Sequence, residues 1–150
     1  MTASATRESL YEEILRSLDG KIIDRTEKSV KRIVLDISPD DVLFMANLFF
    51  KQLNARLQIA TGLDSPDAIV IMYHWAFDQY NLQVTVRTKV DRNKPEIESI
   101  ANIFKGAEWI EREIWELLGV TFKNHPDMRH LLLLDNWPEG KFPLRRDYKK

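Results

Sequence analysis

The feature that most constrains the fold is a pair of adjacent segments with the periodicity of β-strands. Residues 69–78 (IVIMYHWAFD) are apolar on both faces of an extended chain, which predicts a central strand. Residues 82–90 (LQVTVRTKV) alternate apolar and polar side chains, which predicts a strand with one buried and one wet face. Residues 78–81 make a short polar turn between them, so we expect an antiparallel hairpin.

Three further patterns precede and follow this hairpin. Residues 7–18 and 96–104 carry apolar side chains at helical spacing. Residues 31–37 (KRIVLDI) are rich in branched side chains and predict a strand. Ser38 is placed to cap a helix that begins at Pro39 and runs to about residue 57. The order of these elements predicts an α+β fold, in which helices cover a mainly antiparallel sheet.

The predicted helix that begins at Pro39 is apolar around too much of its circumference for a helix with one wet face. Met45 and Phe49 lie on one stripe, but Phe44 and Phe50 lie outside it. One interpretation is a helix packed between the sheet and the other helices. The other is that one side of the helix meets a partner protein.

Composition narrows the class of protein. The 22 basic and 23 acidic side chains give a net charge of −1, so no overall field draws the chain to nucleic acid or to an anionic membrane. The chain has no cysteine, which excludes disulfides and cysteine-ligated metal or iron–sulfur sites. The N-terminus lacks the pattern of a secretory signal and no segment reaches the length of a membrane span, so we expect one soluble domain.

Residues 108–118 predict an amphipathic helix that Gly119 ends in a left-handed conformation. Glu111 falls inside the apolar arc of this helix, whereas Arg112 and Glu116 point away from it. One interpretation places the Glu111 carboxylate at the solvent edge. The other buries it, and a buried charge needs a partner because an unpaired one costs roughly several kcal/mol.

Arginines downstream are candidate partners for a buried Glu111. Arg129, Arg145 and Arg146 carry planar guanidinium groups, which bind carboxylates through two parallel hydrogen bonds. We therefore predict an internal structural clamp, and we assign to it Glu111, Arg112 and Glu113.

The chain changes character after residue 124. Residues 136–143 contain two prolines and a glycine, which keep them out of helices and sheet ladders. Residues 137–150 contain five basic and two acidic side chains, a local charge of +3, together with aromatic side chains of the kind enriched at interfaces. We predict an α+β domain over residues 1–124 and an extended partner-binding tail over residues 125–150. The predicted partner contacts are His125, Asp127, Arg129, Trp137, Phe142, Arg145, Arg146, Asp147 and Tyr148.

The histidines do not form a metal-binding pattern. His125 and His130 are five residues apart, no cysteine accompanies them and there is no HExxH sequence, so we expect hydrogen-bonding roles and no metal site. His74, alone in an apolar strand, is expected to be a satisfied core or edge residue.

Several of these residues together resemble the signature of a known family. The signature is that of the 30 kDa subunit of respiratory complex I (NADH:quinone oxidoreductase), a module that also occurs in energy-converting, membrane-bound nickel–iron hydrogenases. The similar residues cover about the last 40 positions: Glu111-Arg112-Glu113, Trp115, Glu116-Leu117-Leu118-Gly119, Phe122, His125-Pro126-Asp127-Met128-Arg129 and Pro143-Leu144-Arg145-Arg146-Asp147-Tyr148.

Departures from the family pattern favour the hydrogenase-type branch, or a relative such as the sulfur-reducing or ferredoxin-linked complexes. His130 stands where many complex I sequences carry a second arginine, and the sequence stops at Lys150 where they continue in a long tail. Residues 136–140 (NWPEG) also resemble the hydrogenase-type members.

The resemblance implies a subunit with no catalytic, cofactor-binding or metal-binding residue of its own, in the peripheral arm of a membrane-bound redox complex. The implied partners are the large catalytic subunit, the small iron–sulfur subunit and a ferredoxin-like iron–sulfur subunit. These partners would hold the iron–sulfur clusters and, in hydrogenases, the nickel–iron centre, while other subunits couple electron transfer to ion translocation. The chain would lie on the cytoplasmic side of the cell membrane, attached only through the complex.

Three other functions stay open from the sequence. One is a 30 kDa-type subunit of NADH:quinone oxidoreductase proper. The second is an enzyme that uses Glu111, Glu113, His125 and Asp127 as an acid–base cluster. The third is a small RNA-binding module with arginine and tryptophan contacts, which the near-zero net charge disfavours, so no nucleic-acid partner is expected.

Overall fold

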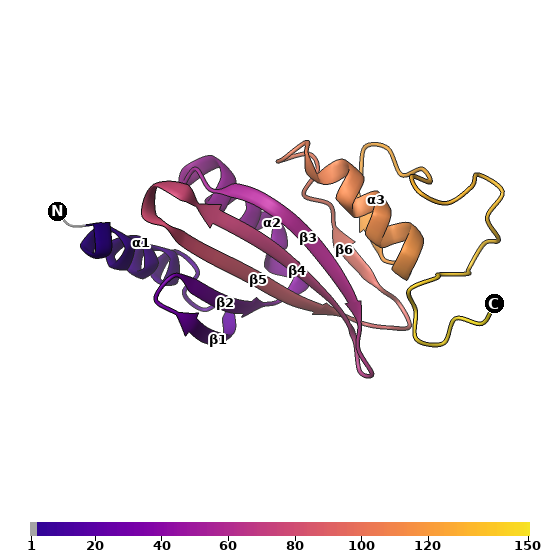
Figure 1. Cartoon of the computed structure of the whole chain (residues 1–150), viewed down its shortest axis with the longest axis horizontal. Coiled ribbons are helices and arrows are strands. Elements are labelled where there is room, and N and C mark those ends of the chain that lie inside the picture. Colours follow the sequence, from indigo (N-terminus) through magenta and orange to yellow (C-terminus); the bar gives the residue numbers. More distant parts are fainter. Residues whose placement is uncertain (1–2) are drawn as a thin grey trace.

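The computed structural model describes residues 3–150. Its main sheet has five strands in the order β1-β2-β5-β4-β3 (Figure 1). β2 and β5 run parallel, and the other neighbouring strands run antiparallel. The prediction of an α+β fold with a mainly antiparallel sheet is confirmed. The strands of this sheet are β1 (Ile22–Ser29), β2 (Arg32–Ile37), β3 (Arg56–Asp64), β4 (Ile69–Phe77) and β5 (Leu82–Val90).

The predicted hairpin is confirmed as β4 and β5. The two strands pair from Ile69 opposite Val90 to Phe77 opposite Leu82. Asn81 closes the turn with a left-handed φ of 50°, a conformation that asparagine tolerates better than most residues. One face of β4 is inaccessible to solvent because it supplies the centre of the core. The side chains on that face are Ile69, Ile71, Tyr73, Trp75 and Phe77.

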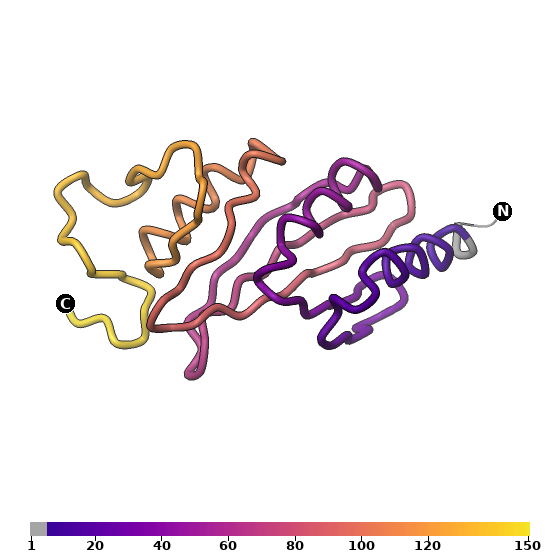
Figure 2. Tube along the Cα trace, turned by 180° about the vertical axis from the view of Figure 1, so that it is seen from behind, coloured from indigo at the N-terminus to yellow at the C-terminus, as the bar shows by residue number. Residues whose placement is uncertain are grey.

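Helical segments cover this inner face of the sheet (Figure 2). They are α1 (Ala3–Ser17) and a continuous stretch formed by a 3-10 turn (Pro39–Asp41), α2 (Val42–Ala46) and a π-helical turn (Asn47–Gln52). The Ser38 side chain accepts the N–H of Asp40 at 3.3 Å, which confirms the predicted cap. Phe49 packs edge-on against the Trp75 and Phe77 rings. Most of the apolar surface of this stretch is therefore internal, as in the first of the two interpretations, although Phe44 stays 45% exposed.

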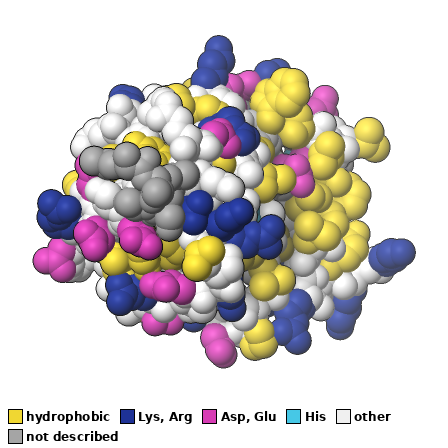
Figure 3. Space-filling view, turned by 60° about the vertical axis from the view of Figure 1, so that its left-hand side comes forward, with side chains coloured by type: hydrophobic (Ala, Val, Ile, Leu, Met, Phe, Trp, Pro, Cys, Tyr) yellow, Lys and Arg dark blue, Asp and Glu magenta, His cyan; other side chains and the backbone are white. Residues whose placement is uncertain are grey.

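The outer face of the sheet is turned toward the reader in Figure 1. His74 lies there, with its ring nitrogens 3.2 Å from the Thr61 hydroxyl and 2.9 Å from the Thr85 hydroxyl on the two neighbouring strands. The expected satisfied histidine is thus confirmed. Ile59 and Leu63 of β3 are 48% and 54% exposed. Apolar side chains gather on the right-hand side of Figure 3, which is the side that faces the reader in Figure 1.

The predicted helix over residues 96–104 is wrong. β6 (Glu96–Glu98) pairs in parallel with β7 (Thr121–Lys123), and turns follow it. Ile97, Ile100 and Ala101 are buried as the spacing suggested. They belong to a short strand and the turn after it, and not to a helix. A strand residue followed by a tight turn gives apolar positions the same spacing as a helix, which is why the pattern was misleading.

Two edge strands of the main sheet were not predicted. β1 is largely exposed and charged, so its sequence lacks an apolar pattern. β3 runs to Asp64, and the chain turns only after that residue. The helical stretch after Pro39 also ends at Gln52 rather than near residue 57.

The molecule is elongated, with α1 at one end and α3 (Ala107–Leu118) with the C-terminal segment at the other (Figures 1 and 2). Within residues 3–150, no helix combines the length and the apolar character needed to cross a bilayer.

Candidate partner-binding site

The predicted helix before the C-terminal segment is confirmed as α3, and it ends as expected. Gly119 has a φ of 76°, and its N–H donates to the Trp115 carbonyl at 2.8 Å. A Cβ atom at Gly119 would lie 2.5 to 2.7 Å from three atoms of the Phe142 ring. Glycine is therefore required twice, for the left-handed conformation and for the close approach of the C-terminal segment.

Glu111 is buried, and its partners come from the turn after β6. Its carboxylate accepts the Ser99 hydroxyl at 2.5 Å and the Ile100 N–H at 2.8 Å. The sequence suggested an arginine as the partner, but none of the three candidate arginines pairs with Glu111: Arg129 and Arg145 bind other groups, and Arg146 is exposed. Burial raises the pKa of Glu111 to about 7 despite these hydrogen bonds, which favour the ionised form. The Tyr73 hydroxyl is buried without a hydrogen-bond partner, and burial, followed by the charge of Glu111, raises its pKa well above the usual value.

His125 lies beside Glu111 and is as deeply buried. Its Nε2 atom is 3.8 Å from the Glu111 carboxylate and 3.0 Å from the Glu108 carbonyl. Its Nδ1 atom accepts the N–H of Asp127 at 3.0 Å. A neutral ring with its proton on Nε2 satisfies both hydrogen bonds, so His125 fixes the chain entering the C-terminal segment.

Arg112 and Glu116 are buried although they point away from the sheet, because residues 129–133 fold over that side of α3. Arg112 donates to the carbonyls of Arg129 at 2.8 Å and His130 at 2.6 Å. The Glu116 carboxylate accepts three consecutive backbone N–H groups, from residues 131, 132 and 133, at 2.7 to 3.3 Å. His130 also lies 3.2 Å from it. Burial disfavours the charge, but these donors outweigh burial and hold the pKa of Glu116 below its usual value.

The end of the C-terminal segment is attached to the other end of α3. Arg145 lies over the Phe142 ring and donates to the carbonyls of Leu118 and Arg92. The N–H of Leu144 donates to the Leu117 carbonyl at 3.0 Å. Nearby, Asp64 pairs with Arg92 and accepts the backbone N–H of Arg146 at 2.8 Å. The segment after residue 124 is therefore folded onto α3 rather than free.

The predicted contact residues have different surroundings. Asp127 and Arg129 form an exposed ion pair at 2.6 Å, and the Arg129 guanidinium holds the pKa of Asp127 below its usual range. The Trp137 ring N–H donates to the Lys141 carbonyl at 2.7 Å. Arg146 is exposed. Four of the predicted residues line one open cavity of about 440 Å³: Phe142, Arg145, Asp147 and Tyr148. Glu113, the third member of the predicted clamp, is exposed.

Sequence reasoning missed two parts of this site. The helical position of Glu116 pointed away from the core, but its carboxylate is buried and organises residues 131–133. Leu132, Leu134 and Leu144 are 64%, 72% and 58% exposed and are not among the predicted contacts. The run of four leucines at residues 131–134 could have indicated exposed apolar side chains, because an irregular segment cannot bury four consecutive side chains.

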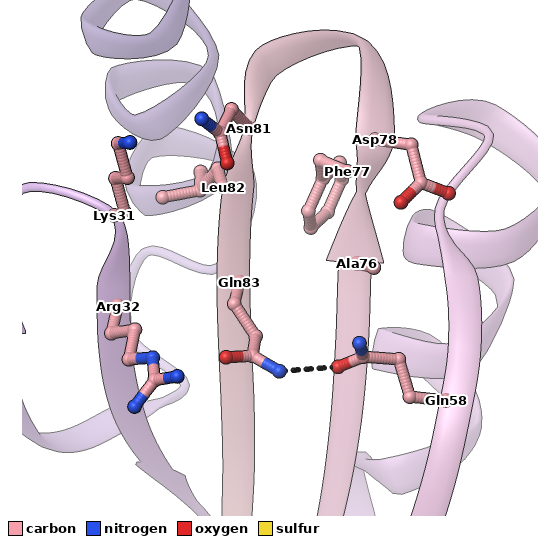
Figure 4. A pocket seen from close by; sticks show the side chains of 9 residues that line it. All are labelled: Lys31, Arg32, Gln58, Ala76, Phe77, Asp78, Asn81, Leu82 and Gln83. Atoms are coloured by element: carbon pink, nitrogen blue, oxygen red, sulfur yellow. Dashed lines mark hydrogen bonds between the residues drawn. The ribbon is translucent and has the colours of Figure 1, made fainter.

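The proposed acid–base cluster does not converge on a cavity. Glu111 and His125 have side chains 1% exposed, while Asp127 pairs with Arg129 and Glu113 faces solvent. A pocket of about 310 Å³ lies at the hairpin end of the sheet (Figure 4). There the Gln83 side-chain amide donates to the Gln58 side-chain oxygen at 2.5 Å, across Ala76. None of the four acid–base candidates, Glu111, Glu113, His125 and Asp127, lines this pocket. Among the described residues, no group of three or more histidine or acidic side chains is arranged to hold a metal.

These features define a class: a small α+β module whose C-terminal segment is folded over its last helix. Residues 35–150 match the family described as respiratory-chain NADH dehydrogenase, 30 Kd subunit, and the chain belongs to this family.

Proteins from several organisms are similar to this chain. The chain is 44% identical over 64 residues to a subunit of the F(420)H(2) dehydrogenase of Methanosarcina mazei, a match that covers 43% of this chain and 40% of that protein. It is 49% identical over 65 residues to a subunit of the NADH-quinone oxidoreductase of Phocaeicola vulgatus, covering 43% of this chain and 12% of that protein. It is 44% identical over 64 residues to formate hydrogenlyase subunit 5 of Escherichia coli, covering 43% of this chain and 11% of that protein. The chain thus spans less than half the length of these relatives.

The fold is also found in a solved structure. A chain in the structure of the membrane-bound sulfane sulfur reductase, an archaeal respiratory membrane complex, aligns with a TM-score of 0.80 and 20% identity. The alignment covers 96% of this chain and 86% of that chain.

Proposed function

We propose that the chain is a non-catalytic structural subunit in the peripheral arm of a membrane-bound respiratory redox complex. The complex is of the energy-converting nickel–iron hydrogenase type or of the complex I type. In this role the chain braces the large catalytic subunit and the iron–sulfur subunits during electron transfer, and partners supply the clusters, the catalytic centre and the coupling to ion translocation. It lies on the cytoplasmic side of the membrane, held there by the complex.

One observation carries this proposal: the C-terminal segment is fixed to α3 by buried polar groups, yet presents apolar and cationic side chains outward. Arg112 and Glu116 hold its backbone from inside. Leu132 and Leu134 project from the same stretch and are mostly exposed. A rigid segment with exposed apolar side chains has the character of a protein interface.

The lengths of the relatives support a large partner. In the NADH-quinone oxidoreductase protein of Phocaeicola vulgatus and in formate hydrogenlyase subunit 5 of Escherichia coli, the matched residues are 12% and 11% of the protein. In both, the similar module is one small part of a much longer chain. Where a module of this kind is a separate chain, a non-covalent interface must replace the covalent link.

The hydrogenase type is our preferred assignment within the family. It depends on residues 136–140 (NWPEG) and on His130, which pairs with Glu116 and packs against the Trp115 ring at 5.1 Å between centroids. A subunit of NADH:quinone oxidoreductase proper is the second candidate, favoured by the family match itself.

Co-purification tests the structural role. The chain is co-expressed with the large subunit of its complex, as the full chain and as a variant that ends at Asp135. The variant keeps residues 131–133 on Glu116, and circular dichroism with a thermal melt checks that it folds. We expect the full chain to co-elute with the large subunit. The shortened chain should bind at least tenfold more weakly, since it lacks residues 136–150, which include the exposed Leu144, Lys141 and Arg146. Equal co-elution of the two folded chains would contradict the proposal.

A further inference from the structure

Three leucines of the C-terminal segment are mostly exposed to water, although burying an apolar side chain is favourable. Leu132, Leu134 and Leu144 are 64%, 72% and 58% exposed. The intervening Leu131 and Leu133 are half-buried. The stretch therefore turns alternate side chains inward and outward, and the outward ones stay in contact with water.

A buried charge fixes this alternation. Glu116, whose side chain is fully buried, accepts the N–H groups of residues 131, 132 and 133 with one carboxylate. Arg112 holds the two preceding carbonyls. Burying a carboxylate is unfavourable unless several donors satisfy it, and here the donors belong to the backbone that carries the leucines. The exposed leucines are therefore held in one orientation before any partner arrives, which lowers the entropic cost of binding.

Two of the arginines that the sequence suggested as partner contacts already bind groups of this chain. Arg145 binds the Leu118 and Arg92 carbonyls, and Arg129 pairs with Asp127. Lys141 and Arg146 are exposed and, within residues 3–150, form no ion pair through their side chains. The outward surface is thus apolar where residues 132 and 134 project, with free cations further along the segment.

We propose that Leu132, Leu134 and Leu144 form the apolar contact of the C-terminal segment and enter a recess on the large subunit, whose rim carries carboxylates opposite Lys141 and Arg146. This inference rests on the proposed function and names the side chains that carry it. It differs from the sequence-based expectation, in which arginines and aromatic residues make the main contacts.

Charge argues against a second copy of this chain as the partner. A two-fold dimer through this surface would place the same patch against itself. Residues 137–150 carry a local charge of +3, so the two copies would repel each other. Three leucines also cover far less than the roughly 800 Å² per partner of a stable interface, so they are the centre of a larger contact.

The test is a triple variant, Leu132→Ser with Leu134→Ser and Leu144→Ser, assayed for binding to the purified large subunit. The control is Ile23→Ser with Val30→Ser, since Ile23 and Val30 are 71% and 78% exposed. Both belong to the β1 region, at the opposite end of the molecule from the C-terminal segment (Figure 1). We expect affinity to fall by about 100-fold or more in the triple variant and by less than about twofold in the control.

Each outcome separates the two proposals. Circular dichroism and the thermal melt establish that both variants fold. If the triple variant binds like the wild type while the chain ending at Asp135 does not, the leucine contact is wrong and the structural role stands. If neither change weakens binding, both proposals are wrong. Sedimentation of the isolated chain tests whether a second copy of the chain binds the leucines instead. If the wild type forms a dimer and the triple variant does not, the proposal that the large subunit binds them is wrong.

Discussion

Two acids of α3 show how position decides protonation. Glu111 faces the core and receives two donors, which do not compensate for its burial, so the pKa rises to about 7. Glu116 faces the C-terminal segment and receives three backbone N–H groups, so the pKa falls. The first group is largely neutral in mild acid and the second is ionised, although they are five residues apart on one helix.

Substitution of Glu111 tests the hydrogen bonds directly. Glu111→Ala at pH 5 should lower the free energy of unfolding by about 2 to 4 kcal/mol, because the Ser99 hydroxyl and the Ile100 N–H lose their acceptor inside the core. Glu111→Gln retains an acceptor and should stay within about 1 kcal/mol of the wild type at this pH. Urea denaturation measures both, and equal stability of Glu111→Ala and the wild type would show that the carboxylate is not buried as described.

Two glycines in the same backbone conformation separate strain from steric overlap. Gly119 and Gly140 have φ values of 76° and 73°, but only at Gly119 would a Cβ atom meet the Phe142 ring, while space is open at Gly140. Gly140→Ala should destabilise the fold by about 1 kcal/mol through strain. Gly119→Ala should cost about 2 to 3 kcal/mol. Thermal denaturation compares them, and the excess at Gly119 should shrink in a Phe142→Ala background.

At the scale of elements, the C-terminal segment and α3 form one unit that the Glu116 carboxylate holds together. Glu116→Gln removes the charge and places an amide against three N–H donors, so residues 131–133 should detach from the helix. We expect a loss of about 3 kcal/mol, and faster deuterium exchange at the three amides. Glu113→Gln on the exposed side of α3 is the control and should leave exchange unchanged. Unaltered protection in Glu116→Gln would mean that other contacts hold the segment.

The sequence predicted the elements whose periodicity is strong and missed those whose form depends on neighbours. The β4–β5 hairpin, α3 and the Ser38 cap follow from local patterns. β1 is a charged edge strand and has no apolar pattern in the sequence. Residues 96–104 form a short strand and a turn, and their local pattern does not distinguish this structure from a helix. In the candidate site, the inward position of Glu111 was predictable from the helix, but its Ser99 partner was not, because residue 99 was expected in a helix. The burial of Glu116 depended on where the C-terminal segment would fold.

At the scale of the whole molecule, the two ends are stabilised in different ways. The sheet and its covering helices are stabilised by a core centred on residues such as Trp75 and Phe49. The far end is built from α3 and an irregular segment (Figure 1). Buried polar groups hold this segment, and Leu132, Leu134 and Leu144 stay mostly exposed. The core of the sheet is therefore stable without the exposed leucines, which do not contribute to the packing of this chain.

The buried acids set how the stability of the whole molecule depends on pH. The pKa of Glu111 is higher in the folded chain than in the unfolded chain, so its stabilisation is complete below pH 4.5 and is lost as the pH rises to about 7. The rise in pKa corresponds to about 3 kcal/mol, all of it lost above that pH. Glu116 and Glu98 have lowered pKa values, so their contributions are lost as the pH falls below the usual range for carboxylates.

Stability should therefore be greatest near pH 5 and decline on both sides, which chemical denaturation at intervals from pH 3 to pH 9 measures. Glu111→Gln mimics the protonated acid, so in this variant the decline between pH 5 and pH 8 should largely disappear while the acid limb stays. At pH 8 the variant should exceed the wild type by about 2 to 3 kcal/mol. A wild-type profile that is flat from pH 5 to pH 8, or a variant with the same slope, would show that Glu111 does not titrate inside the fold.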